Sequence, residues 1–204
     1  MRPDPGPRPP TSPPLRTSPP VVRPEVPRVV RAADLPLDAL RAQVRAGALV
    51  RVARGVYAPP PPSEPPWDRA MHQLLARAAA CHALRSGEHW FSHRTAAALW
   101  GCALDVVPGV VDVTTLVPHR AGRARRGGHV SEHWTRDERR AADLCRHLAL
   151  PASTLERTAL DCAATLTPAS GLVVVDSALR MGADRAVLDR LLARAAGERA
   201  VARA

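Results

Sequence analysis

Several histidines and cysteines in this sequence have the types and spacings that metal sites and general bases use. The close pairs are Cys81 with His82, His89 with His93, and His129 with His133. Two ligands four residues apart on one helix suit zinc. The first histidine pair spans an expected helix start, however, and the second lies on an expected strand, and no further cluster completes a site. We therefore expect no metal and no cofactor.

Nucleophilic catalysis is not indicated either. No Ser/His/Asp or Cys/His combination has supporting sequence context. The chain contains no lysine, which excludes a Walker A lysine, a Schiff base and lysine-containing nuclease motifs. The four cysteines are far apart and form no C-x-x-C pair. We expect no catalytic residues and no enzymatic activity.

The charge of the chain indicates an acidic partner. All 29 basic residues are arginine, against 19 acidic residues, for a formal net charge of +10. Such a balance makes nucleic acid the leading partner class. The densest basic cluster is the segment 118–129, whose arginines are Arg120, Arg123, Arg125 and Arg126. This secondary basic loop either contacts phosphate or an acidic partner, or is simply solvated.

A short helix and a hairpin place further arginines near the N-terminus. Leu37, Leu40 and Val44 recur at helical spacing, which predicts a helix over 37–46, and Arg41 and Arg45 share its other face. In "GALVRVARGVYAP", a strand over 49–53 is followed by an Arg-Gly turn and a return strand. Gly55 is suited to positive φ in that turn.

This order of elements is that of a recognition helix followed by the wing of a winged helix-turn-helix domain. The helix would enter the major groove, and the wing would touch the DNA backbone. The candidate DNA-binding residues are Arg41, Gln43, Arg45, Arg51, Arg54, Gly55 and Tyr57. The alternative is that these arginines are solvated, or that those on the hairpin edge deter strand pairing.

The stretch "ALRAQVRAGALVRVARGVYA" resembles the winged-helix segment of AbiEi-family antitoxins, the regulatory components of type IV toxin–antitoxin modules. The motifs "SHRTAAALWG", "VDVTTLVP", "PASTLERTALDCA" and "VVDSALRMG" follow in the order of that family's second domain. The resemblance covers about residues 29–195. Family members usually have two helices before the recognition helix. Here only "RVVRAAD" remains between the proline-rich start of the chain and the recognition helix, which implies an abbreviated winged helix. The endonuclease-like domain of many relatives is not expected in these 204 residues.

The second domain is expected to be α+β, mainly helical with a small antiparallel sheet. Helices are predicted from Trp67 to Leu84, over 92–101, and over about 153–165, 169–181 and 184–195. "GVVDVTTLVP" is a predicted strand, "GHVSEHWT" its antiparallel partner and "CRHLALPAS" a third strand. The core should consist of Ala, Leu and Val around Trp67, Trp90, Trp100 and Trp134.

Several residues of the quoted motifs are interpreted as structural. Ser92 is the predicted N-cap of its helix, and His93 should cap or pack beside Trp100. Arg157 with Asp161 and Asp176 with Arg180 are four residues apart on helices and are expected to form surface pairs. The resemblance implies that these positions organise the domain rather than perform chemistry.

Prolines divide the chain. Residues 1–28 hold 11 of its 22 prolines and form a predicted disordered Pro/Arg-rich tail. Residues 29–58 form the abbreviated winged-helix segment, 59–66 a proline linker, 67–195 the antitoxin-type domain, and 196–204 a C-terminal tail. The sequence has no secretory start and no apolar run long enough to span a membrane, so we expect a cytoplasmic protein.

Two functions fit these patterns. The first is a DNA-binding transcriptional regulator that binds its own promoter as double-stranded DNA and acts as an antitoxin. The second is a protein-interaction module that binds a nucleotidyltransferase-like toxin or another protein through a degenerate winged helix. The sequence leaves the operator, the toxin and the oligomeric state open.

Overall fold

The computed structural model describes residues 24–63, 65–116, 129–135 and 142–195. Over these residues the protein is α+β, with six α-helices, a three-stranded antiparallel sheet and a five-stranded mixed sheet. The α+β class is therefore confirmed. The predicted basic loop arginines Arg120, Arg123, Arg125 and Arg126 lie outside the described residues.

The strands of the smaller sheet lie on either side of the first helix in the sequence. Its elements are β1 (Val30–Arg31), the 3-10 helix η1 (Ala32–Asp34), α1 (Leu37–Arg45), β2 (Val50–Ala53) and β3 (Val56–Ala58). The strand order is β1-β3-β2, and both pairs are antiparallel. The predicted helix and hairpin are confirmed at nearly the predicted bounds.

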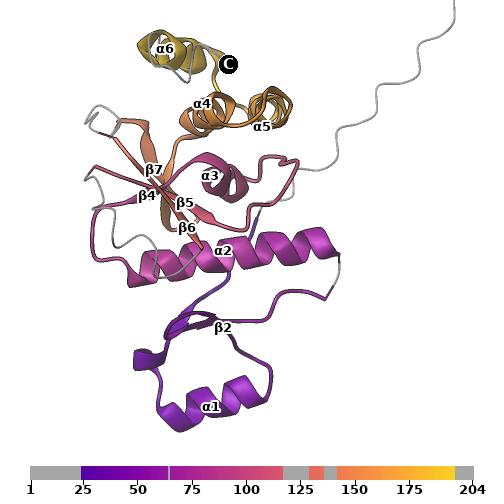
Figure 1. Ribbon diagram of the computed structural model, residues 1–204, viewed down its shortest axis with the longest axis vertical. Helices are drawn as coiled ribbons and strands as arrows, with labels where there is room; N and C mark the ends of the chain where they lie inside the picture. The colour runs from indigo at the N-terminus through magenta and orange to yellow at the C-terminus, as the bar shows by residue number, and fades with distance from the viewer. Residues whose placement is uncertain (1–23, 64, 117–128, 136–141, 196–204) are drawn as a thin grey trace, which may run out of the picture.

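Helix α2 (Pro66–Leu84) crosses the molecule between the two sheets (Figure 1). Pro66 occupies the first helical position, where a missing N–H costs nothing. Leu74, Leu75 and Ala78 are fully or almost fully buried, as the helical periodicity predicted. Trp67 and Leu84, at the two ends of the helix, are 42% and 54% exposed.

The larger sheet corrects two sequence predictions. Its strands are β4 (Trp90–Phe91), β5 (Val111–Thr115), β6 (Val130–Trp134), β7 (Leu144–His147) and β8 (Leu150–Ser153), in the order β6-β5-β4-β8-β7. Strands β5 and β6 are parallel, not antiparallel, and β4 and β8 are also parallel. The predicted third strand is a hairpin of two strands, with Leu148 and Ala149 in the left-handed region at its turn. The sheet is therefore mixed.

The remaining helices are α3 (His93–Trp100), α4 (Leu155–Thr165), α5 (Pro168–Arg180) and α6 (Arg185–Ala195). Their ends carry common capping signals: Gly101 ends α3 with φ of +82°, and the side chains of Thr154 and Thr167 cap α4 and α5. Helix α3 packs against α2, β5 and α4, and so connects the mixed sheet to the C-terminal helices.

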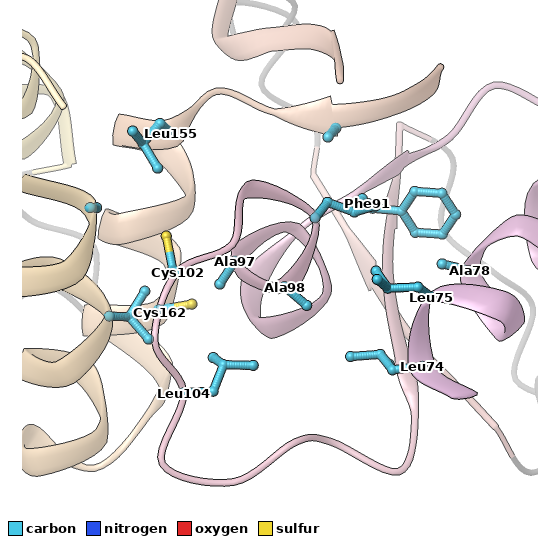
Figure 2. Close-up of a cluster of buried hydrophobic side chains, with 14 of the residues drawn as sticks. Leu74, Leu75, Ala78, Phe91, Ala97, Ala98, Cys102, Leu104, Leu155 and Cys162 are labelled. Carbon is cyan, nitrogen blue, oxygen red and sulfur yellow. The ribbon is translucent and has the colours of Figure 1, made fainter. Parts of the chain in front are cut away.

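The core is built from small side chains around Phe91, which is fully buried (Figure 2). Ala97 and Ala98 of α3 lie between Leu75 and Ala78 of α2 on one side and the α4–α5 layer on the other. The expectation of four core tryptophans is wrong, because only Trp90 is buried below one tenth. Alanine-rich helix faces leave little depth between layers, so large indole rings stay at the margins.

Several further features bear on the sequence predictions. Val26 packs against the core and Pro27 is buried, so contacts with the folded part begin inside the segment predicted as tail. All four cysteines are free. In the described part of the chain, no helix has the length and apolar character needed to cross a membrane.

Candidate nucleic-acid interface

Helix α1 extends from the body of the protein with most of its surface in solvent (Figure 1). Leu40 is 5% exposed and anchors it, together with Leu49 just beyond its end. The candidate side chains of Arg41, Gln43 and Arg45 are all exposed. A helix attached along so narrow a strip leaves these donors free to approach a partner surface.

Two apolar residues of α1 are also exposed. Leu37 is 57% and Val44 41% exposed, although the helical periodicity assigned both to the buried face. Only a short strand and one 3-10 turn precede α1, and within α1 only Leu40 is buried and only Ala39 is half-buried. The exposed side of α1 is therefore both basic and apolar.

The β2–β3 hairpin has the predicted turn. Gly55 has φ of +72°, in the region that glycine adopts without strain. The register shifts between Arg51 and Ala53, and the Arg51 Nε donates to the Ala53 carbonyl at 3.3 Å. Arg51 and Arg54 are exposed, and Tyr57 is half-buried opposite Arg51 in the ladder. The hairpin therefore presents two guanidinium groups near its tip.

A groove of about 530 Å³ lies between this hairpin, α2 and the edge of the mixed sheet. The hairpin contributes Arg51 and Arg54 to its lining, and α2 with its C-cap contributes Arg77, Cys81 and Arg85. Sequence reasoning missed the α2 residues. The spacing of four residues places Arg77 and Cys81 on one face of α2, and Arg85 follows at the C-cap, which is a signal that a search for basic helix faces would have found.

The groove is strongly basic. Arg85 pairs with Glu132 of β6, and Arg77 Nη1 donates to the Gly109 carbonyl at 3.0 Å. Arg54 has no hydrogen bond or ion pair with any residue in the described ranges. Burial raises the pKa of the Cys81 thiol, while Arg85 acts in the opposite direction. The thiol is therefore neutral and does not offset the arginines.

A second polar cluster, in which Ser92 and Thr114 are buried, lies where α3 meets β5. The hydroxyl groups of Ser92 and Thr114 are 2.7 Å apart, and His93 Nδ1 lies 2.9 Å from Ser92 Oγ. Ser92 is at the N-cap position of α3, but its side chain caps no backbone N–H, which corrects the predicted role. It connects α3 to β5 instead.

His93 is constrained on several sides. Its φ is +50°, which non-glycine residues rarely adopt, and its ring stacks on His133 with centroids 3.9 Å apart. His133 Nε2 lies 3.1 Å from Asp112 Oδ1. The pKa of His93 is lowered to about 4, mainly by desolvation; His133 and Arg157 contribute to the lowering, and Asp161 and Asp112 oppose it. His93 is therefore neutral near neutral pH.

This cluster resembles a catalytic arrangement only in composition. The hydroxyl of Ser92 is buried with its residue at 0% exposure, and it is already bonded to Thr114 and adjacent to His93. A nucleophile needs access to a substrate and an acceptor for its proton. Asp112 Oδ2 is buried without a partner among the described residues, so the carboxylate is held by one oxygen. The geometry fits a structural connection between α3, β5 and β6.

The predicted place of His93 beside Trp100 is also corrected. Trp100 stacks on His147 of β7 with centroids 3.9 Å apart, and its Nε1 donates to the Ser153 carbonyl at 2.9 Å. The two rings therefore belong to opposite ends of α3. His93 contacts the β5–β6 side, whereas Trp100 contacts the β7–β8 side.

The two predicted ion pairs form, but in different environments. Arg157 and Asp161 are 2.6 Å apart with side chains only 10% and 8% exposed, so this is a buried pair rather than a surface pair. Arg180 and Asp176 are also 2.6 Å apart, with both side chains more than half exposed, as expected. Helix α4 lies against α3, α5 and α6, which explains the burial of the first pair.

The histidine contacts in the structure differ from the pairs that the sequence spacing indicated. His82 Nδ1 lies 3.0 Å from His89 Nε2, and His93 instead contacts His133. Within the described ranges, no group of three or more His, Cys, Asp or Glu side chains is arranged to hold a metal ion.

Comparisons with known proteins give limited information. No protein-family model matches the chain, and no curated protein matches it. Among solved structures, it is similar to the RV2827C protein from Mycobacterium tuberculosis, with a TM-score of 0.46 and 21% sequence identity. The match covers 82% of this chain and 67% of that chain. A likeness of this degree assigns neither a family nor a function.

Proposed function

We propose that this protein is a DNA-binding transcriptional regulator that binds operator DNA through α1 and the β2–β3 hairpin. The observation that carries the proposal is the exposure of Arg41, Gln43 and Arg45 on α1, next to an arginine-tipped hairpin. Exposed basic groups on a helix and an adjacent hairpin suit a major groove and its flanking phosphates.

The order of the elements supports this proposal. A strand and a short 3-10 helix precede α1, and the sheet order is β1-β3-β2. This is the order expected for a recognition helix followed by its wing, with the preceding helices reduced to η1. The abbreviated winged helix thus remains our interpretation of residues 29–58.

The proposed contacts fall into two classes. Arg51 and Arg54 would contact phosphates, which positions the protein without reading sequence. Arg41 and Arg45, which share one face of α1, would face base edges, where arginine recognises guanine. Gly55 would allow the turn, and Tyr57 would support the hairpin from its half-buried position. No catalytic step is part of this function.

Salt-titrated binding to the protein's own promoter and to a scrambled duplex tests the proposal. Arg54→Ala should weaken binding to both duplexes equally and reduce the magnitude of the slope of log affinity against log salt by about 0.9. Arg45→Ala should narrow the difference between promoter and scrambled duplex by about 1 to 3 kcal/mol. Parental binding by both variants, or no binding by the parent protein, would refute this function.

We further propose that the regulator is an antitoxin of the AbiEi type, on the motif resemblance over residues 29–195. Its partner would then be a cytoplasmic nucleotidyltransferase-like toxin encoded beside it. Co-expression with the product of the neighbouring gene tests this: an antitoxin restores growth that the toxin alone arrests. Growth arrest unchanged by this protein would remove the antitoxin assignment and leave the DNA-binding proposal standing.

A protein-interaction module is the second candidate, and the exposed apolar residues favour it. Leu37 and Val44 of α1 and Val50 of β2 are each more than one third exposed. Leu37→Ser with Val44→Ser removes apolar surface and keeps the charge of α1. If this double variant loses a protein partner but keeps its affinity for DNA, α1 serves protein recognition.

A further inference from the structure

The groove between the hairpin and α2 is distinct from the proposed DNA-reading surface of α1. Its lining, over the described residues, comes from β2 and the turn, from α2, and from the mixed sheet at Val111, His129 and Val130. No described residue of α1 lines it. The volume of about 530 Å³ falls within the range of about 300 to 1,000 Å³ that is usual for small-molecule sites.

The walls of the groove carry four arginines and one acid close by. Arg51 and Arg54 lie on the hairpin, Arg77 lies on α2, and Arg85 lies at the C-cap of α2. Among the described residues, Arg85 is the only one of the four that has a carboxylate partner, Glu132, so positive charge is in excess there. Arg51 and Arg77 each donate to one backbone carbonyl, and a guanidinium group has five N–H donors. Donors therefore remain on both walls for an anion between them.

The groove also has an apolar part. Val52 of β2, Leu84 of α2, and Val111 and Val130 of the mixed sheet line it together with the arginines. A simple inorganic anion has no apolar part that could pack against this surface. A ligand with a phosphate and a flat or apolar body would use both, because guanidinium groups bind phosphate through paired hydrogen bonds and stack on aromatic rings.

We propose that this groove is a binding site for a small phosphate ester of nucleotide size, with its phosphate between the hairpin arginines and Arg77 and its body against the apolar residues. The site goes beyond the proposed DNA contacts, because Arg77, Cys81 and Arg85 take no part in them. A DNA duplex has its phosphates on a rigid rod, so it would reach the exposed hairpin arginines and leave the apolar wall unused.

Isothermal titration calorimetry of the full chain with AMP, adenosine and inorganic phosphate tests the site. AMP should bind with a Kd below about 1 mM, and adenosine and phosphate should each bind at least about tenfold more weakly. Arg77→Gln should weaken AMP binding about tenfold, since it removes one charge-assisted contact. Arg190→Gln, an equal charge change on the exposed surface of α6, should leave AMP binding unchanged.

Cys81 supplies a second measurement that needs no substitution. It lines the groove, whereas Cys145 on β7 is half-buried elsewhere and serves as the internal reference. AMP should slow alkylation of Cys81 by N-ethylmaleimide at least about threefold relative to Cys145, as expected when the site is mostly occupied. This readout holds even if Arg77→Gln alters folding.

Three outcomes would overturn the proposal. Phosphate binding as tightly as AMP would reduce the groove to a plain anion site. AMP binding without Arg77 dependence and without Cys81 protection would place the ligand elsewhere. Absence of AMP binding, combined with weaker promoter binding by Arg77→Gln, would assign the groove to the DNA surface. The calorimetric result does not depend on whether the protein binds DNA, so the two proposals can fail separately.

Discussion

Folding stability should depend on the protonation of His93. The ring is mostly buried, and its pKa is about 4 in the folded protein against 6.5 for the ordinary side chain. Above pH 6.5 neither the folded nor the unfolded state is protonated at this residue. Between pH 6.5 and about 4 only the unfolded state binds the proton, so acidification favours unfolding.

The size of this effect follows from the two pKa values. Each pKa unit corresponds to about 1.4 kcal/mol, so the full interval is worth about 3 kcal/mol of unfolding free energy. Between about pH 7 and pH 5 the expected loss is about 2 kcal/mol, and below about pH 4 the contribution levels off. The pKa values of His82 and His147 are also lowered by desolvation, so they change stability in the same direction.

The control variant is His93→Asn, because asparagine tolerates a φ of +50° and does not titrate. Urea unfolding of both proteins at the two pH values gives a double difference that cancels the other histidines and the loss of ring stacking. The parent should lose about 2 kcal/mol more than the variant. NMR titration of the imidazole protons adds a direct check. The same pH dependence in both proteins, or a His93 midpoint near 6.5, would refute the burial argument.

Further substitutions test the ion pairs, the hairpin turn and the helix packing. Arg157→Ala leaves its buried aspartate partner without a counter-ion and should cost about 3 to 5 kcal/mol in chemical denaturation, whereas Arg180→Ala in the exposed pair should cost less than about 1 kcal/mol. Gly55→Val should cost about 1 to 2 kcal/mol of unfolding free energy and weaken DNA binding, because valine resists the φ of +72° at this position. Steric contact is not the cause, since a Cβ there meets no atom within 4 Å. Gly55→Asn should retain stability and DNA binding, because asparagine tolerates positive φ. Gly171→Ala places a Cβ 3.2 Å from the Ala163 Cα and should lower the melting temperature by separating α4 and α5; an unchanged value would show that the helices adjust freely.

Elements with a strong local pattern could be predicted from the sequence. Helices α4, α5 and α6 lie within two residues of their predicted bounds, because caps and apolar periodicity are local signals. The hairpin turn was also predictable, since an Arg-Gly pair between two β-prone runs is typical of a hairpin turn.

Long-range pairing could not be predicted in the same way. The alternation in β5 and β6 is the same for parallel and antiparallel neighbours, and only the connection length favours one over the other. Strands β1 and β4 have two residues each, too few for any periodicity. The burial of Arg157 and the contact of Ser92 with Thr114 depend on which elements meet, and no spacing within one helix contains that information.

The candidate sites also combine residues that the sequence indicates with contacts that only the structure shows, and this affects how the sites are tested. The hairpin arginines Arg51 and Arg54 were evident from the sequence, but the structure places them on a groove wall as well as on the exposed tip. Substituting either one would therefore disturb both proposed sites. Arg45, on α1, and Arg77, on α2, each belong to only one of them. These two residues, rather than the hairpin arginines, can distinguish recognition of DNA from binding of a small phosphate ester.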